Sequence, residues 1–480
     1  MSVEIKKNLI NGEWVEGVGA TENRNPADIT DLVGVYASGN ADHVGAAAEA
    51  AHQAQVAWAA VSPQVRADIL ERVGLEIVAR KDEIGRLLAR EEGKTLVEAT
   101  GEAMRAGLIF KFFAAEAIRV SGDALDSVRP NVDITITREA VGVVGLITPW
   151  NFPVAIPAWK IAPALAYGNA VVFKPADLVP GCAHLLAEIL HDAGIPAGVF
   201  NLVMGPGRVV GNAIVEHPLI KAISFTGSVP VGRQMAVDAA KHLKKIQLEM
   251  GGKNPMVIMD DADLSIAVPT AINSGFYSTG QRCTASSRLI VQEGIYDAFA
   301  EQMIVATESL IVGNPLDASV QMGPVASASQ LAGNLEYVDI AKQDGAYVIG
   351  GERIESMPNG HFQRPALFMD ATNQMRSSRE EIFGPCVSVI KVRDFDEAVA
   401  TANDTEFGLS AGICTGSLKY AREFKRLSQA GMVMTNLPTA GVDYHVPFGG
   451  SKGSSYGSRE QGRYAAEFYT TVKTAYCFAG

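Results

Sequence analysis

One cysteine of this chain lies in a segment suited to nucleophilic chemistry. Cys283 belongs to GQRCTASSR, residues 280–288, where a glycine-bounded turn precedes it and small residues follow, so little bulk shields its sulfur. Upstream, Glu249 of LEMGGKNP stands before a Gly-Gly pair that lets the backbone approach another group closely. A thiol nucleophile together with a carboxylate that activates water can form and then hydrolyse a thioester. Most cysteines are small buried hydrophobic residues, so on its local sequence alone Cys283 could equally be structural.

An asparagine follows the end of a predicted strand. Asn151 belongs to PWNFP, residues 149–153, directly after the apolar run VGLIT. Ligands of open α/β sheets bind beyond the carboxyl ends of the strands. The two prolines hold the turn rigid, and the Asn151 amide can donate to an oxyanion that develops during a reaction. The alternative is an asparagine that caps the turn.

A second strand end carries a lysine and a carboxylate. In VVFKPAD, residues 171–177, Lys174 could bind ribose hydroxyls. Asp177 could accept a hydrogen bond from a 2′-hydroxyl while repelling a 2′-phosphate. Taken alone, the segment could also be a loop with two solvated charges.

Two glycine-containing segments could hold phosphate. In FTGSVPVG, residues 225–232, Gly227 follows a strand and Ser228 is a predicted N-cap of the next helix, whose first N–H groups attract anions. GPGRVVG, residues 205–211, resembles a dinucleotide-binding loop but lacks the GxGxxG spacing, so by itself it indicates little.

Two further segments could contribute to a pocket. In EEIFGP, residues 380–385, Glu381 and Phe383 lie on the same side if the chain is extended. A carboxylate for sugar hydroxyls would then accompany an aromatic face for a nicotinamide ring, and the alternative is a helix end with a core phenylalanine. PFGGSKGSS, residues 447–455, is a glycine-rich loop in which Phe448 could line a pocket or belong to the core.

The composition is that of an ordinary globular protein with an acidic balance. The 480 residues are 48% hydrophobic and 20% charged, and a net charge of −12 argues against a surface built to bind nucleic-acid phosphates. The five cysteines are scattered without CxxC spacing, which favours free thiols in a reducing compartment. The eight histidines show no paired ligand spacing, so we expect no metal site. Since the sequence has no signal-peptide core and no run of about 18 apolar residues, we expect a cytoplasmic protein without a membrane span.

The spacing of apolar residues differs between regions of the chain. Residues 41–122 are predicted to be helical, because apolar residues recur at three- and four-residue spacing. From residue 141, short β-branched runs alternate with helical segments, which is typical of a parallel sheet covered by helices on both faces. A second alternation begins near residue 254 and predicts a second α/β unit. Two half-exposed strand patterns, residues 132–139 and 467–477, could pair with each other and add to the sheet of another subunit.

The motifs occur in an order that resembles the aldehyde dehydrogenase superfamily. PWNFP, KPAD, FTGS, LEMGGKNP, GQRC, EEIFGP and PFGG span residues 149–450, and the flanking segments agree, so the resemblance covers essentially the whole chain. It implies an α/β fold with a Rossmann-like cofactor domain, an α/β catalytic domain and a small β oligomerisation domain, in a homodimer or homotetramer. The ranges implied are residues 1–122 and 141–251 for the cofactor domain, 252–450 for the catalytic domain, and 123–140 and 460–480 for the oligomerisation strands.

The resemblance also implies a role for each candidate residue. Cys283 would be the nucleophile, Glu249 the general base, and Asn151 with the Cys283 backbone N–H the oxyanion hole. Thiolate attack on an aldehyde would give a thiohemiacetal, hydride transfer to the nicotinamide would leave a thioester, and hydrolysis would release the acid. The residues implied in cofactor binding are Trp150, Lys174, Ala176, Asp177, Gly207, Gly227, Ser228, Val231, Glu381 and Phe383. Those implied in binding the aldehyde are Phe152, Trp159, Arg282, Thr284 and Phe448.

Three residues bear on the choice of cofactor and substrate. Asp177 stands where many NAD-preferring relatives carry glutamate, so we expect NAD with some use of NADP. The C-terminal segment from GVDYHVPFGG to TTVKTAY is similar to a bacterial branch of the family that includes α-ketoglutaric semialdehyde (2,5-dioxopentanoate) dehydrogenases. This similarity predicts oxidation of 2,5-dioxopentanoate to 2-oxoglutarate. Succinate or glutarate semialdehyde and aromatic aldehydes are the alternatives, because Trp159 stands where several dicarboxylic semialdehyde dehydrogenases place an arginine. Arg282 is the predicted cation for the substrate carboxylate, with a structural ion pair as the alternative.

Two other classes of function fit the sequence less well. A cysteine hydrolase or acyltransferase without nicotinamide would need a histidine partner, and no histidine lies in a comparable turn. A non-catalytic scaffold would not need a nucleophile, a base and an oxyanion donor, all of which the chain contains.

Overall fold

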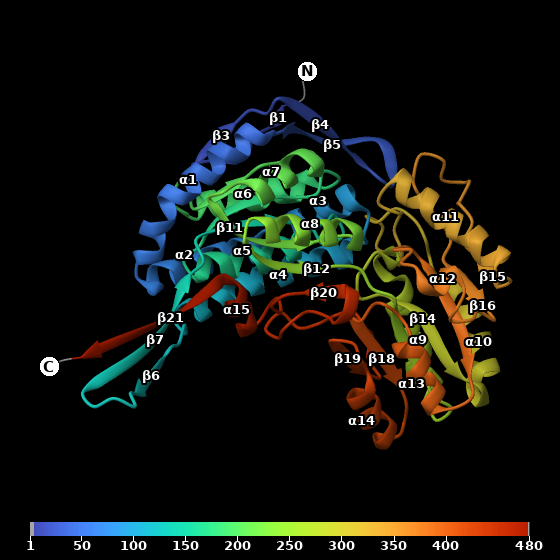
Figure 1. The fold of residues 1–480 in the computed structure, drawn as a ribbon. Coiled ribbons are helices and arrows are strands. Elements are labelled where there is room, and N and C mark those ends of the chain that lie inside the picture. Colours follow the sequence, from blue (N-terminus) through green and yellow to red (C-terminus); the bar gives the residue numbers. More distant parts are fainter. Residues whose placement is uncertain (1–3, 479) are drawn as a thin grey trace.

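The computed structural model describes residues 4–478 and 480, and two large sheets form its body (Figure 1). The first sheet has eight strands in the order β20-β12-β11-β8-β9-β10-β2-β3, and its five strands from β12 to β10 run parallel. The predicted parallel sheet after residue 141 is therefore present. Its strands are β2 (Asn8–Ile10), β3 (Glu13–Val15), β8 (Val143–Ile147), β9 (Ala170–Lys174), β10 (Phe200–Leu202), β11 (Ile220–Thr226), β12 (Lys245–Glu249) and β20 (Ser455–Tyr456).

Helices cover both faces of this sheet because its central strands are apolar on both sides. Val143 and Ile147 of β8 belong to one core with α1, α7 and α8, whereas Val144 and Leu146 belong to another with α2 to α6. The helices are α1 (Ala41–Ala60), α2 (Pro63–Ala79), α3 (Lys81–Glu92), α4 (Leu96–Ala117), α5 (Ala155–Ala166), α6 (Pro180–Asp192), α7 (Asn212–Glu216) and α8 (Val229–Lys241). The first four confirm the helical prediction for the region before residue 122.

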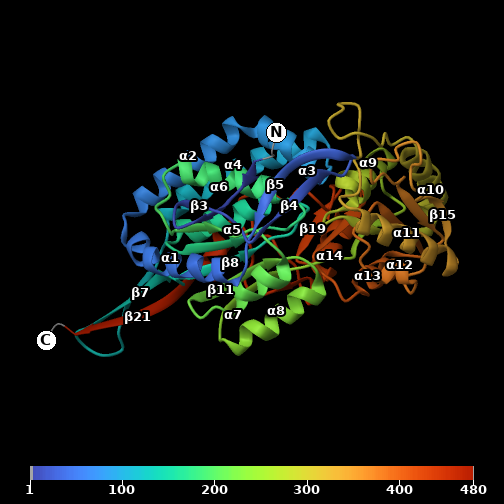
Figure 2. The ribbon, with the colours of Figure 1, turned by 90° about the horizontal axis from the view of Figure 1, so that it is seen from above.

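The second sheet has seven strands in the order β15-β16-β17-β14-β13-β18-β19, all parallel except β15. It too is covered on both faces, by α9 and α10 on one side and by α13 and α14 on the other. The two sheets lie in different halves of the body when it is viewed from above (Figure 2). The elements are β13 (Asn254–Ile258), α9 (Leu264–Phe276), β14 (Ser286–Gln292), α10 (Glu293–Glu308), α11 (Ala328–Gln343), β15 (Tyr347–Gly350), β16 (Ala366–Met369), α12 (Arg376–Arg379), β17 (Cys386–Val392), α13 (Phe395–Asn403), β18 (Ser410–Cys414), α14 (Leu418–Leu427) and β19 (Met432–Thr435).

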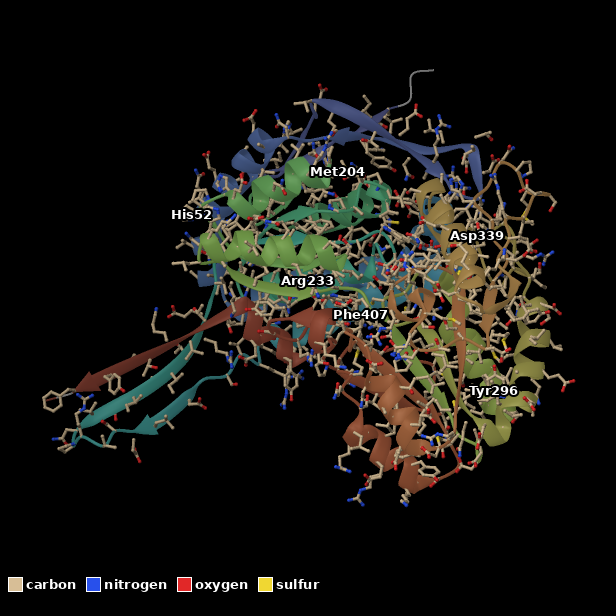
Figure 3. All side chains as sticks on the ribbon, turned by 45° about the vertical axis from the view of Figure 1, so that its right-hand side comes forward. His52, Met204, Arg233, Tyr296, Asp339 and Phe407 are labelled. Carbon is tan, nitrogen blue, oxygen red and sulfur yellow. The ribbon has the colours of Figure 1, made fainter. Side chains whose placement is uncertain are left out.

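A three-stranded arm projects from the body and carries the C-terminal end of the chain at its tip (Figures 1 and 3). It contains β6 (Asp123–Asp126), β7 (Val132–Ala140) and β21 (Thr470–Phe478). β21 pairs antiparallel with β7 from Thr470 opposite Ala140 to Phe478 opposite Val132, which confirms the predicted pairing. The predicted strand at 467–477 begins too early, because Ala466–Tyr469 form the short helix α15.

The N-terminal region contains a small sheet that the sequence patterns did not indicate. β1 (Ile5–Lys6), β5 (Asp28–Ser38) and β4 (Gly19–Asn25) lie side by side in that order. β4 is polar and mostly exposed, and the apolar run LVGVYA of β5 is only partly buried, so neither strand shows the apolar–polar alternation of a half-buried strand. Among the residues that the structure describes, no helix is long and apolar enough to cross a membrane. The domain boundaries given above stay a prediction.

Candidate active site

Cys283 lies between a strained turn and the strand β14. The short helical turn η2 (Tyr277–Gly280) precedes it, and within that turn Ser278 and Thr279 adopt φ values of 51° and 56°. Such left-handed conformations are costly for residues other than glycine and persist only where neighbours enforce them. Glu98 supplies that enforcement, since its Oε1 accepts hydrogen bonds from the backbone N–H and the Oγ of Ser278 at 2.8 and 3.0 Å.

Two cavities share Cys283. The larger cavity, of about 480 Å³, contains all five residues implied in aldehyde binding: Phe152, Trp159, Arg282, Thr284 and Phe448. The smaller cavity, of about 290 Å³, contains Trp150, Asn151, Gly227, Ser228, Glu381 and Phe383. The half-buried thiol thus faces the predicted substrate residues in one cavity and the predicted nicotinamide-side residues in the other.

The environment of Cys283 favours the neutral thiol. Burial raises its pKa above the usual range, and the negative charges of Glu249 and Glu381 raise the pKa further. The sulfur must therefore lose its proton before it can attack a carbon atom, and both carboxylates are close enough to influence that step.

Glu249 ends β12 and is buried, with 2% of its surface exposed. Its Oε2 accepts a hydrogen bond from the Ser455 Oγ at 2.6 Å. Burial raises the pKa of Glu249 well above its usual value, and the charge of Glu460 raises the pKa further. A carboxylate with a raised pKa is a stronger proton acceptor, as a general base requires.

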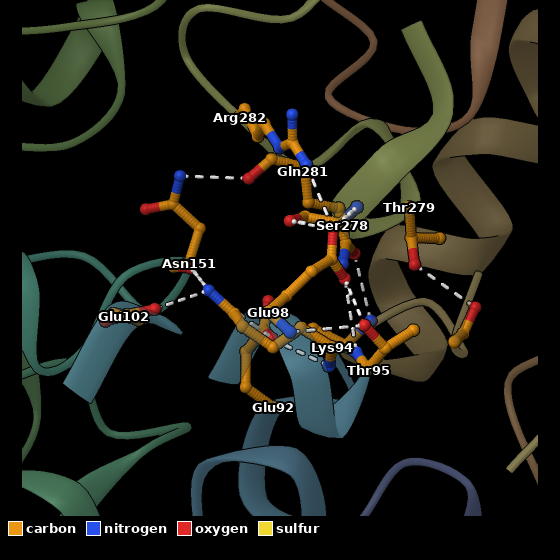
Figure 4. A network of polar contacts seen from close by, with 12 residues as sticks. Glu92, Lys94, Thr95, Glu98, Glu102, Asn151, Ser278, Thr279, Gln281 and Arg282 are labelled. Atoms are coloured by element: carbon orange, nitrogen blue, oxygen red, sulfur yellow. Dashed lines mark hydrogen bonds and ion pairs between the residues drawn. The ribbon is translucent and has the colours of Figure 1, made fainter. Parts of the chain in front are cut away.

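Asn151 is the middle residue of the PWNFP turn, with its side chain directed toward the segment that carries the thiol (Figure 4). Its Nδ2 donates to the backbone oxygen of Gln281 at 2.9 Å. Because an amide nitrogen has two hydrogens, one remains for another acceptor. The backbone oxygen of Asn151 accepts from the Lys94 Nζ at 2.6 Å, so the turn is held at both its side chain and its backbone.

The predicted ribose residues lie together at the end of β9. The Lys174 Nζ is 2.9 Å from the Asp177 Oδ1, and burial lowers the pKa of this lysine. Gly207 lies beside them, since a Cβ added there would be 3.8 Å from the Lys174 Nζ. Ala176 is partly buried in the same segment. These positions form one polar group at the carboxyl edge of the sheet, where a ribose could bind.

Ser228 and Val231 lie at the start of α8. Ser228 occupies the N-cap position as predicted, but its side chain makes no capping hydrogen bond. The donors of the first helical turn therefore stay available to an anion, apart from the proline nitrogen. Val231 is half exposed on this first turn.

Glu381 and Phe383 close the smaller cavity. The Glu381 Oε1 accepts from the backbone N–H of Gly252 at 2.9 Å, and burial raises the pKa of this carboxyl to about 7. A Cβ added at Gly251 would lie 2.0 Å from the Glu381 Oε2, so only glycine admits the carboxylate here. The Phe383 ring meets the Trp150 ring edge to face at 5.4 Å. An open cavity with an aromatic wall and a carboxylate fits a nicotinamide riboside.

Arg282 has a partner within the chain, and its contact with a substrate carboxylate stays a prediction. Its Nη2 donates to the Glu98 Oε1 at 2.9 Å, and both side chains are largely buried (Figure 4). Arg282 lines the larger cavity, but Glu98 already neutralises its charge. The structural ion pair, left open as the alternative, is the arrangement observed.

Trp159 has a polar partner that its sequence position did not reveal. Its Nε1 donates to Glu460, which also pairs with the buried Lys160, and its ring stacks on Phe448 at 5.3 Å. Trp159 therefore offers the cavity a ring face and no free donor. Glu460 lies 301 residues from Trp159, so no local pattern could have linked them.

Sequence reasoning also missed Arg105. This residue of α4 lines the larger cavity together with Glu98 and Glu102, at intervals of four and three residues along one helix face. A single charged residue in an amphipathic helix gives no signal by itself. Among the described residues, no group of three or more His, Cys, Asp or Glu side chains could hold a metal ion.

Comparisons with known proteins agree with this geometry. The family model described as "Aldehyde dehydrogenase family" matches residues 14–475. The α-ketoglutaric semialdehyde dehydrogenase of Bacillus subtilis (strain 168) is 45% identical over 475 residues, which are 98% of this chain and 97% of that relative.

Two solved structures extend the comparison. Betaine aldehyde dehydrogenase from Staphylococcus aureus in complex with NAD+ gives a TM-score of 0.97 at 32% identity, covering 99% of this chain and 95% of the other. An Escherichia coli NADP-dependent enzyme gives a TM-score of 0.95 at 37% identity, covering 98% of each chain. These likenesses confirm the predicted fold.

Proposed function

This chain belongs to the aldehyde dehydrogenase family and is an NAD(P)-dependent aldehyde oxidoreductase, and from that premise we propose that it oxidises 2,5-dioxopentanoate to 2-oxoglutarate. The Bacillus subtilis relative bears the name of this activity and matches nearly the whole chain. The hypotheses of a nicotinamide-independent hydrolase and of a non-catalytic scaffold are therefore set aside.

The observation that carries the chemical proposal is a single thiol shared by two cavities. An aldehyde in the larger cavity would present its carbonyl carbon to the Cys283 sulfur, and attack would form a thiohemiacetal. The free Nδ2 hydrogen of Asn151 and the Cys283 backbone N–H would donate to the resulting oxyanion.

The smaller cavity and the adjoining strand ends would hold the dinucleotide. Lys174 and Asp177 would bind the ribose next to the adenine, the start of α8 the pyrophosphate, and Glu381 with Phe383 the nicotinamide riboside. When bound, the dinucleotide supplies a hydride acceptor. With the hydride gone, the substrate carbon stays attached to Cys283 as a thioester.

Glu249 would then accept a proton from the water that attacks the thioester. Its pKa, raised by burial and by the charge of Glu460, suits this role because such a carboxylate takes up a proton more readily than an ordinary one. Hydrolysis releases the acid and returns the thiol.

For the cofactor we propose NAD, with NADP also accepted. The Asp177 carboxylate is partly exposed beside Lys174, where its charge would repel a 2′-phosphate. Aspartate is one methylene shorter than glutamate, which weakens this repulsion and leaves room for NADP.

An uncharged or aromatic aldehyde is the second candidate substrate. The stacked rings of Trp159 and Phe448, together with Phe152, give the larger cavity an apolar wall. Such a wall would hold a benzene ring as readily as the methylene chain of a semialdehyde.

A panel of aldehydes tests these substrates directly. Purified enzyme is given NAD or NADP with 2,5-dioxopentanoate, succinate semialdehyde, glutarate semialdehyde, propanal or benzaldehyde, and reduced nicotinamide is followed by its absorbance. We expect the acidic semialdehydes to exceed propanal and benzaldehyde at least about tenfold in kcat/KM, since a charge-assisted hydrogen bond discriminates by more than that. A higher constant for benzaldehyde would overturn the substrate proposal and leave the family assignment intact.

We further propose that the enzyme is a cytoplasmic homodimer or homotetramer. Its five cysteines are all free thiols, as a reducing compartment favours. The arm presents apolar side chains to solvent, which a second subunit could cover.

A further inference from the structure

We propose that Arg105 is the residue that binds the substrate carboxylate in the larger cavity and so determines specificity for acidic aldehydes. This inference rests on the proposed function and names the group that recognises the substrate. It assigns to a different residue the task that the sequence suggested for Arg282.

Arg105 has acceptors at two of its guanidinium nitrogens and none at the third. Nη2 donates to the Gln461 Oε1 at 3.0 Å, and Nη1 donates to the backbone oxygen of Val442. The Nε is buried and has no hydrogen-bond partner. A buried donor without a partner costs free energy that a ligand oxygen would recover.

The charges that line the cavity balance everywhere except at Arg105. Glu98 pairs with Arg282 at 2.9 Å. Glu102 pairs with Lys94 at 2.6 Å. Among the described residues, Arg105 makes no ion pair, and its two acceptors are neutral oxygens.

An uncompensated cation in a largely buried position attracts an anion. Burial lowers the pKa of Arg105, whereas the charges of Glu102 and of the exposed Asp443 oppose that shift without contacting the guanidinium. Arginine stays protonated in proteins, so the positive charge persists in the cavity. A substrate that brings its own negative charge would complete the site.

The surroundings select a carboxylate on a short apolar chain. The guanidinium carbon lies 5.9 Å from the centre of the Trp159 ring, and Phe152 and Phe448 complete the apolar wall. Since the Trp159 Nε1 is taken by Glu460, Arg105 is left as the donor on this wall. A planar guanidinium matches the two oxygens of a carboxylate.

The test compares charged and neutral substrates in matched variants. kcat/KM is measured for succinate semialdehyde and for butanal, which have the same number of carbons, in the wild type, Arg105→Gln, Arg105→Lys and Arg282→Gln. We expect the acidic-to-neutral ratio to fall roughly 10- to 100-fold in Arg105→Gln, as loss of a hydrogen bond to a charged group implies. In Arg105→Lys the acidic-to-neutral ratio should fall less, because lysine retains the positive charge but lacks the planar guanidinium.

Arg282→Gln is the matched control on the same cavity. It should lower the rates for both aldehydes, because it loosens the turn before the thiol, and it should change their ratio less than Arg105→Gln does. Glutarate serves as a second probe: we expect it to compete with the semialdehyde in the wild type and to inhibit Arg105→Lys more weakly.

The outcomes separate this inference from the proposed function. If the wild type prefers succinate semialdehyde and both Arg105 variants keep that ratio, the inference is overturned and the proposed function stands. If the wild type favours butanal, the proposed substrate class itself is wrong. Should Arg105→Gln not fold, the Arg105→Lys ratio and the glutarate inhibition decide the matter alone.

Discussion

At the residue scale, the two acid-base groups of the site influence each other. Burial and the charges of Glu249 and Glu381 raise the pKa of Cys283, and burial and Glu460 raise the pKa of Glu249. The Ser455 hydroxyl acts in the opposite direction, because its hydrogen bond stabilises the Glu249 carboxylate. The protonation of Glu249 should therefore respond to changes at neighbouring residues.

Glu249→Gln should spare acylation and slow deacylation. We expect a burst of reduced cofactor followed by turnover that is lower by about 10²–10⁴-fold, the usual cost of losing a general base. Stopped-flow absorbance measures both phases. A normal steady-state rate would assign the base to another residue.

Ser455→Ala should move the pH dependence of deacylation. A carboxylate acts as a base only when deprotonated, so the wild-type rate should rise as pH increases through the raised pKa of Glu249. Removing the Ser455 hydrogen bond raises that pKa further, and the rise should shift to higher pH. An unshifted profile of single-turnover deacylation would contradict this prediction.

Asn151→Ala should reduce turnover with little effect on KM. Loss of one oxyanion donor costs roughly 10²–10³-fold in kcat. Steady-state kinetics over a range of semialdehyde concentrations measure both constants. An effect confined to KM would argue that Asn151 only shapes the cavity.

At the element scale, α4 organises the larger cavity. Its residues Glu98, Glu102 and Arg105 share one face, and each holds a different part of the site. Glu98 holds the turn before the thiol, and Glu102 accepts from the backbone N–H groups of Val154 and Ala155 at the start of α5. One helix thus sets the relative positions of the segments that carry Cys283 and Asn151.

Lys94→Met should destabilise the fold and impair catalysis together. Lys94 is buried between Glu102 and the backbone oxygen of Asn151, so its loss leaves Glu102 without a counter-ion. Breaking a buried pair from one side costs about 3–5 kcal/mol in the free energy of unfolding. Denaturant unfolding and kcat report the two effects, and Lys342→Met, at an exposed pair with Asp339, is the control that should change neither. Equal stability of both variants would contradict the role of Lys94.

At the scale of the whole molecule, the arm exposes large apolar side chains to solvent. Val472, Tyr476 and Phe478 lie on one face of β21, because alternate residues of a strand point the same way. Their exposed fractions are 61%, 59% and 66%, although side chains of this kind are usually buried. A second copy of the chain could cover them.

Replacing Val472 and Tyr476 by aspartate should shift the protein toward monomer. Charged side chains on the arm would have to lose water in any interface formed there. Sedimentation velocity at micromolar concentration measures the change. The double substitution Thr471→Asp with Ala475→Asp, on the opposite face of the same strand, is the control that should shift the mass less. An unchanged mass in the first variant would place the interface elsewhere.

The sequence by itself determined the family, the two α/β units and the pairing of the two distant arm strands. These depend on local patterns: apolar runs, periodicity, and short motifs whose residue types follow from backbone turns and ligand chemistry. The resemblance to the family also grouped the residues that line the two cavities.

Only the tertiary structure decided which charges remain free in those cavities. Arg282 looked available beside the nucleophile, but Glu98 lies 184 residues away and reaches it only through packing. Arg105 belongs to no recognisable motif, and its hydrogen-bond acceptors lie more than 330 residues further along the chain. Ion pairs in a buried site depend on which side chains the folded chain brings within a few ångströms of each other. The pattern of a single sequence does not show which distant residues become neighbours.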